Sequence, residues 1–166
     1  RKTPDEQFNL AVNYEFGQLG SSQNISKAIS LYTKAANRGL ANTQHNLALL
    51  YDHGKGVPKD TQKAIIWYTK AAKQGLSISQ FNLAQTYSDM GTDKDFKEAI
   101  KWYEECKDSD FMGKFQLGLL VHMGIGTVQD KSRGLKLLKE AANEGGDETK
   151  AKLEAYLSNP EGDESY

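Results

Sequence analysis

Two histidines, His53 and His122, are the side chains in this sequence whose chemistry most readily suggests a metal site. A structural or catalytic zinc site needs several His, Cys or carboxylate ligands at characteristic spacings. The two histidines lie far apart in the sequence, and no such set accompanies either of them. We therefore expect surface or groove histidines, and we predict no metal site.

The one cysteine, Cys106, and two glycine-rich segments are the other candidates for chemistry. Cys106 takes the place that Ala71 holds in a related segment, which favours a small buried thiol over a nucleophile. Residues 54–57 and 124–128 follow predicted helices rather than strands, so we interpret them as turns, not phosphate-binding loops. The sequence contains no signature of a serine hydrolase, a P-loop or a zinc peptidase. It predicts no catalytic residue, no cofactor and no enzyme.

Composition and charge exclude several classes of partner. The chain has 166 residues, with 21 basic and 22 acidic side chains interspersed and a formal net charge of -1. This balance gives no electrostatic footprint for nucleic acid or an anionic membrane. No apolar run approaches the roughly 20 residues that span a bilayer, so we predict no membrane insertion. The chain does not begin with Met, so the missing targeting segment leaves the compartment unknown.

A period of 34 to 37 residues runs through the sequence. It is set by Leu10, Leu47, Leu83 and Leu117, and a further leucine, Leu153, follows after 36 more residues. Such a period is typical of solenoids built from one repeated supersecondary unit. We predict an all-α superhelix, or solenoid, of about four helix-turn-helix repeats and a C-terminal capping helix.

Each repeat has the same internal order. A first helix, here termed helix A, carries an apolar pair at i and i+4, such as Leu47 and Tyr51. A glycine-bearing turn and a capping residue then precede a second helix, termed helix B. The expected caps are Asn24, Asp60, Asp95 and Asp130. Three helices B are expected to end at Gly39, Gly75 and Gly145, with Asp110 at the equivalent place in the third repeat.

Small residues recur in two columns, where a larger side chain would hold the paired helices apart. They are Ala11, Ala48, Ala84 and Gly118 on the helices A, and Ala28, Ala64, Ala99 and Gly134 on the helices B. We predict one solenoid domain over residues 1–158, with repeats at about 4–40, 41–76, 77–110 and 111–146 and the capping helix at 147–158. Residues 159–166 are predicted to be an acidic tail.

The second repeat carries a motif that identifies a family. It contains Gly54-Lys55-Gly56-Val57, the cap Asp60, Ala64 with Trp67-Tyr68, and Ala71-Ala72 followed by Gly75. This combination resembles the Sel-one-like repeat (SLR), a relative of the tetratricopeptide repeat, and the resemblance covers about residues 4–158. The resemblance implies a right-handed superhelix that serves as an adaptor or scaffold in protein complexes. It permits a periplasmic, secreted, endoplasmic reticulum or cytoplasmic location.

We predict that a partner protein or peptide binds the concave surface formed by the helices A. Residues two before and two after each helix A leucine lie off its buried stripe, and amides form a neighbouring column. The predicted partner-binding residues are His45, Leu49, Phe81, Gln85, Phe115, Leu119, Asn46, Asn82, Asp52 and Asp89. Two alternatives stay open: the aromatic column packs between repeats, or the amides bond neighbouring helices. At the N-terminal edge, Phe8, Val12 and Phe16 could also pair with another copy.

Other functions compete with the adaptor. A dedicated inhibitor or immunity protein would need only a groove for one effector enzyme. An RNA-binding helical repeat would need a basic groove, and the groove positions here are mostly apolar, amide or acidic. A cell-wall hydrolase would need clustered catalytic groups, with Asp89 and His122 as the residues to test.

Overall fold

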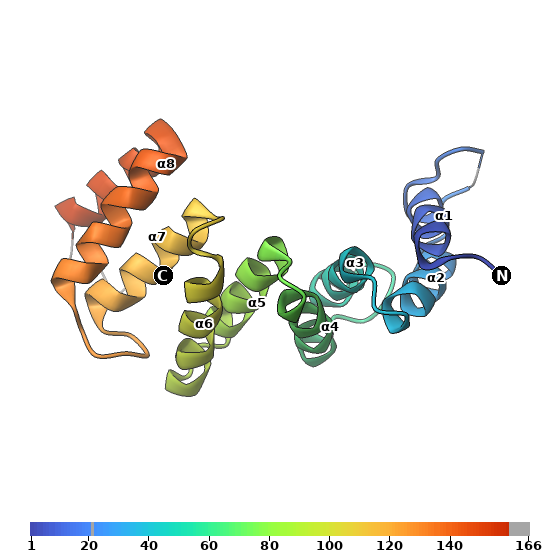
Figure 1. Cartoon of the computed structure of the whole chain (residues 1–166), viewed down its shortest axis with the longest axis horizontal. Helices are drawn as coiled ribbons and strands as arrows, with labels where there is room; N and C mark the ends of the chain where they lie inside the picture. The colour runs from blue at the N-terminus through green and yellow to red at the C-terminus, as the bar shows by residue number, and fades with distance from the viewer. Residues whose placement is uncertain (21, 160–166) are drawn as a thin grey trace. The chain divides into compact units, whose positions relative to one another are not determined.

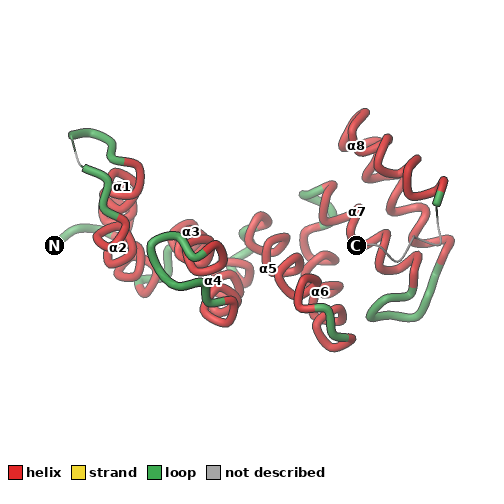
Figure 2. Tube along the Cα trace, turned by 180° about the vertical axis from the view of Figure 1, so that it is seen from behind, coloured by secondary structure: helices red, strands yellow, loops and turns green. Residues whose placement is uncertain are grey.

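The computed structural model describes residues 1–20 and 22–159, and over these ranges it contains eight helices and no strand (Figure 2). Apart from Asn159, the predicted acidic tail at residues 159–166 lies outside the described residues. In chain order (Figure 1) the helices are α1 (Pro4–Phe16), α2 (Ile25–Asn37), α3 (Ala41–His53), α4 (Thr61–Lys73), α5 (Ser77–Met90), α6 (Asp93–Cys106), α7 (Phe111–Met123) and α8 (Lys131–Ser158). The predicted fold class, an all-α solenoid of helix-turn-helix repeats, is confirmed. None of the described helices is long and apolar enough to span a membrane.

The chain divides into two compact units, Arg1–Thr86 and Tyr87–Tyr166, here termed unit 1 and unit 2. In unit 1 the pairs α1–α2 and α3–α4 form the first two repeats, and α2 also packs against α3. In unit 2 the helix α7 packs against both α6 and α8. Odd-numbered helices are therefore the helices A and even-numbered helices the helices B.

Side-chain caps start the helices B largely where the sequence predicts. The side chains of Asn24, Asp60 and Asp130 each accept a hydrogen bond from a backbone N–H in the first turn of the helix that follows. Their own N–H groups donate back to carbonyls of the preceding helix A, as from Asp60 to Tyr51 at 2.9 Å. The cap residue thus both begins helix B and closes the turn.

Three predicted helix ends are wrong in position. Helix α6 begins one residue after Thr92, whose side chain forms a capping box with Asp95 in the first turn. Asp110 caps the start of α7 rather than ending α6. The break inside α8 falls at Gly146, whose φ of 73° is a conformation open mainly to glycine, whereas the predicted Gly145 stays helical and packs against Phe111 and Thr149 with no room for a Cβ.

The core of unit 1 combines small residues with buried tyrosine and leucine. Ala11, Ala28, Tyr32 and Leu47 have no solvent exposure. Phe8 and Val12 of the N-terminal edge are partly buried against this core, and the rings of Phe8 and Tyr32 lie 5.9 Å apart. Of the three apolar residues expected at this edge, Phe16 alone is largely exposed, at 57%.

The core of unit 2 draws on α7 and on both segments of α8. Its buried members include Phe115, Leu138 and Leu153. Leu153 lies after the break at Gly146, so the predicted capping segment contributes to this core. The small-residue columns hold throughout: their alanines have no solvent exposure, and Gly118 and Gly134 are buried between α7 and α8.

Candidate functional site

Each helix A has one solvent-facing stripe. On α3 it consists of Asn42, Asn46, Leu49 and His53, spaced at i, i+4, i+7 and i+11, while Leu47 on the other side is fully buried. Spacing of three and four residues keeps side chains on one face of a helix. This stripe is therefore the part of helix A that a partner can contact.

Most of the predicted partner-binding residues are at least partly exposed. Asn46, Leu49, Phe81, Asn82 and Gln85 are half-buried in unit 1, as is Asp52. In unit 2, Leu119 is half-buried beside the core and Asp89 is exposed. Their role in partner binding remains a prediction.

His45 and Phe115 do not face solvent as expected. Phe115 is 5% exposed within the unit 2 core, and His45 is 7% exposed. The His45 Nδ1 lies 2.8 Å from the Ser79 Oγ on α5, and its ring packs 5.6 Å from that of Tyr68. At these two positions the side chains pack inside the units, which is the alternative that the sequence left open.

The burial of His45 predicts an acid-sensitive fold. Burial lowers the pKa of His45 below its ordinary value of 6.5, so the folded chain keeps the ring neutral where the unfolded chain protonates it. The unfolded state then binds more protons, and stability falls as the pH drops below 6.5 toward the lower folded pKa. In urea unfolding at pH 7.5 and pH 5.5, the wild type should lose more stability than a His45→Gln variant. Equal losses would contradict this assignment.

A tyrosine from helix B links each pair of helices A in unit 1. The Tyr32 hydroxyl donates to the Glu15 Oε2 at 2.7 Å, and the side chain of Asn46 in the next repeat interacts with the same hydroxyl and partly offsets the rise in its pKa. Tyr68 repeats the arrangement with Asp52 at 3.3 Å and Asn82. Burial and the adjacent carboxylate raise the pKa of both tyrosines. The two amides thus interact with the tyrosine of the preceding repeat, and each retains further hydrogen-bonding groups.

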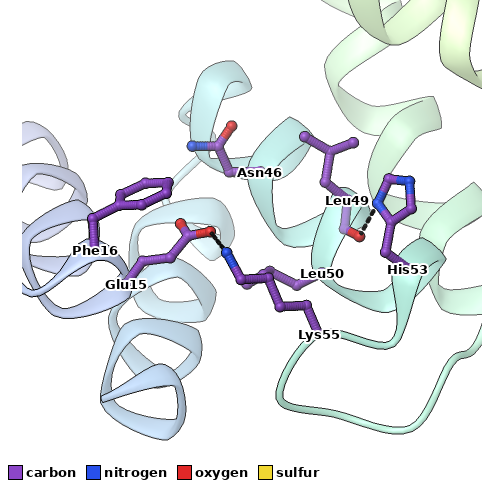
Figure 3. Close-up of a pocket in the computed structure, with 7 residues that line it drawn as sticks. All are labelled: Glu15, Phe16, Asn46, Leu49, Leu50, His53 and Lys55. Carbon is purple, nitrogen blue, oxygen red and sulfur yellow. Dashed lines mark hydrogen bonds and ion pairs between the residues drawn. The ribbon is translucent and has the colours of Figure 1, made fainter. Parts of the chain in front are cut away.

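A pocket lies between the solvent-facing sides of α1 and α3 (Figure 3). It has a volume of ≈ 310 Å³ and is lined by Glu15, Phe16, Asn46, Leu49, Leu50, His53 and Lys55. Phe16 and Leu49 lie on either side of an ion pair in which the Lys55 Nζ is 3.0 Å from the Glu15 Oε1. The Lys55 Nζ also lies 5.1 Å from the centre of the Phe16 ring, a cation–π distance. The pocket therefore combines apolar walls with a fixed charge.

The predicted partner-binding set contains two of the seven pocket residues, Asn46 and Leu49, while His53 was expected as a surface or groove histidine and Phe16 at the N-terminal edge. Residues 46, 49 and 53 share one helical face, so this spacing could have added His53 to the predicted partner-binding set. Glu15 and Lys55 come from different repeats, 40 residues apart, and no local pattern predicts that they meet.

Cys106 and His122, which were also considered for other chemistry, do not line this pocket, whereas His53 does. Cys106 is fully buried, and burial raises the pKa of its thiol to about 12, so it is a poor nucleophile. The His122 Nδ1 lies 2.6 Å from the hydroxyl of Tyr156, at the end of α8. Among residues 1–20 and 22–159, no three His, Cys, Asp or Glu side chains are grouped to hold a metal ion.

Comparison with solved structures places the chain among repeat proteins of the same fold. A Sel1 repeat protein from Oxalobacter formigenes is 31% identical with a TM-score of 0.83, over 92% of this chain and 63% of that chain. A protective antigen of uropathogenic Escherichia coli strains, which displays an SLR fold, is 31% identical with a TM-score of 0.81, over 93% of this chain and 33% of that chain.

The sequence match to a curated relative covers a much shorter part of both chains. DAP3-binding cell death enhancer 1 of Rattus norvegicus is 37% identical over 57 residues, which are 32% of this chain and 11% of that protein. The chain therefore spans only a small part of the curated relative and less than two thirds of both structural neighbours. The family model of the Sel1 repeat matches residues 7–40, 41–76, 77–105 and 112–146. Since these four segments make up most of the sequence, the chain belongs to the Sel1 repeat family.

Proposed function

We propose that this chain is a protein-binding module that holds an extended segment of a partner on the solvent-facing helix A surface of unit 1. The pocket between α1 and α3 is the anchor point of this proposal. Sel1 repeats generally serve as protein–protein interaction modules, which supports the general class. The particular site rests on the pocket itself.

Phe16 is the observation that carries the proposal. An exposed aromatic ring in a concave, partly apolar site is the usual form of a binding hot spot. Phe16 is 57% exposed, although it stands beside half-buried Leu49 and buried Leu50 in the same pocket. A partner side chain that fills this space would cover Phe16 and gain the apolar area that the unit leaves in water.

The half-exposed polar groups beside the pocket suit an extended backbone. Asn46 on α3 and Asn82 with Gln85 on α5 carry amides on the solvent-facing stripes of unit 1. Amide side chains offer both donors and acceptors, as a peptide backbone requires. The apolar pocket would supply affinity, and the amides would set the direction of the bound segment.

An affinity capture from source-cell extract tests the proposal. Wild-type protein is compared with a Phe16→Ser/Leu49→Ser variant and with an Ile66→Ser control, since Ile66 is 53% exposed on α4 and does not line the pocket. We expect the pocket variant to lose a captured protein that the control retains, with helical circular dichroism unchanged in both. Retention by all three proteins would exclude the pocket as the binding site. One stoichiometric partner bound at nanomolar concentration would narrow the function to a dedicated inhibitor.

A further inference from the structure

We infer that the pocket between α1 and α3 recognises an acidic side chain that stands close to an apolar side chain in the partner segment. The inference rests on the proposed function and specifies the chemistry of the segment. Three features of the pocket support it: its carboxylate is buried with both oxygens hydrogen-bonded, its lysine is held in place with unused N–H donors, and its walls are apolar.

The Glu15 carboxylate is buried, and each of its oxygens already accepts a hydrogen bond within unit 1. Its Oε1 accepts from the Lys55 ammonium at 3.0 Å, and its Oε2 accepts from the Tyr32 hydroxyl at 2.7 Å. The Glu15 side chain is 10% exposed, and its charge is paired with Lys55 inside unit 1. A basic residue of the partner would therefore find no exposed carboxylate among the residues that line the pocket.

Lys55 is the group that can meet a ligand. An ammonium carries three N–H donors, and Glu15 accepts one of them. The Lys55 side chain is 45% exposed, and Glu15 together with the Phe16 ring fixes the position of its Nζ. A lysine held in place loses less side-chain entropy on binding a carboxylate than a mobile one, and the bond that forms is a charge-assisted hydrogen bond.

The walls require that the acidic residue has an apolar neighbour. Phe16, Leu49 and Leu50 surround the ion pair in Figure 3. The His53 Nδ1 donates to the backbone carbonyl of Leu49 at 3.0 Å, which holds the imidazole at the rim of the pocket. An isolated carboxylate would leave these walls in water, whereas a segment with a neighbouring aliphatic or aromatic side chain would cover them.

We propose a side-chain carboxylate rather than the carboxylate at the end of a chain. The solvent-facing stripe continues beyond the pocket to Asn82 and Gln85 of α5 within unit 1. A segment that ended at Lys55 could use this surface on one side of the pocket only. A segment that passes through can use both.

A peptide library displayed without free carboxyl termini tests the inference. Dodecapeptides selected on the wild-type protein should carry Asp or Glu next to an apolar residue. The tightest peptide is then synthesised with an amidated C-terminus, and its Kd is measured by fluorescence anisotropy. Replacing its Glu by Gln, or Lys55 by Gln in the protein, should each weaken binding about tenfold, and the two changes together should weaken it little further.

Two control variants separate the charge from the fold. Lys55→Arg keeps the cation and should bind within about threefold of wild type. Lys70→Gln removes a comparable lysine, whose Nζ lies 4.4 Å from the centre of the Trp67 ring on α4, and should leave the Kd unchanged. The peptide variant needs no change in the protein, so it tests the inference even if Lys55→Gln lowers stability.

The outcomes distinguish this inference from the proposed function. The acidic anchor is wrong if the selected peptides lack acidic residues, or if they bind Lys55→Gln as tightly as wild type. The binding site is nevertheless supported if Phe16→Ser/Leu49→Ser abolishes the binding of those peptides. If the amidated peptide does not bind and the same peptide synthesised with a free C-terminal carboxylate does, the inference is also overturned. If no peptide is selected, both the inference and peptide binding at this pocket fail.

Discussion

Replacing Gly134 by alanine should lower the free energy of unfolding of unit 2 by about 2–3 kcal/mol, the cost of overpacking a tight helix interface. A Cβ at this position would lie 2.5 Å from the His122 backbone nitrogen and 2.6 Å from its Cα, closer than such atoms approach in proteins. Backbone atoms cannot turn aside as a side chain can, so α7 and α8 would have to separate. This effect opposes the gain of about 1 kcal/mol that alanine brings to a helix in place of glycine.

The comparison with the other repeats makes this prediction specific. Ala64 holds the same column position in the second repeat, and its Cβ is accommodated there without solvent exposure. In the fourth repeat both facing columns are glycine, and a Cβ at Gly118 would also lie only 2.9 Å from the Leu138 Cγ. We infer that α7 and α8 depend on glycine at their crossing where the earlier pairs use alanine.

Chemical unfolding followed by Trp102 fluorescence, in a Trp67→Phe background, reports on unit 2. Ser132→Ala, near the start of α8, is the matched control for helix propensity and should not destabilise. A Gly134→Ala protein as stable as wild type would show that the two helices adjust at little cost. The close approach would then have no energetic importance.

The repeat and its helices were predictable because they depend on local chemistry. A leucine every 34 to 37 residues, a small residue after it and an Asn or Asp before helix B each follow from periodicity or capping. The errors at Thr92 and Gly146 arise where two residues close together in the sequence could each begin or end the helix. Thr92 and Asp95 complete one capping box together, and Gly145 and Gly146 are both glycines at which α8 could break.

The site was harder to predict because a helical face can meet either solvent or a neighbouring helix. His45 stands ~200° around the helix from Leu47, a direction that the sequence assigned to the groove. The structure places Ser79 of α5 there, and only Asn46 and Leu49 reach the pocket. Whether a residue is exposed thus depends on the side chains of the next repeat. The residue pattern of a single helix carries no information about them. The Glu15–Lys55 pair was unpredictable for the same reason.

Replacing Tyr32 by phenylalanine should destabilise unit 1 by about 2–3 kcal/mol, more than the loss of an ordinary hydrogen bond. The change removes one hydroxyl and leaves the Glu15 Oε2 without its donor. Glu15 is only 8% exposed, so water cannot readily replace the lost donor to its charge. The hydroxyl bonds α2 to Glu15 of α1, and Glu15 is in turn paired with Lys55 of the second repeat, so its loss should weaken the junction between two repeats as well as one helix pair.

Tyr68→Phe provides the matched comparison inside the same unit. Its hydroxyl reaches Asp52 at a longer 3.3 Å, and Asp52 is half-buried, so water can solvate the carboxylate and the expected loss is about 1 kcal/mol. Both variants are measured by urea unfolding with Trp67 fluorescence in a Trp102→Phe background. Adding Glu15→Ala should remove most of the difference in destabilisation between Tyr32→Phe and Tyr68→Phe. The buried carboxylate that loses its donor in Tyr32→Phe is then absent. Equal losses for Tyr32→Phe and Tyr68→Phe would show that the burial of Glu15 does not set the strength of this junction.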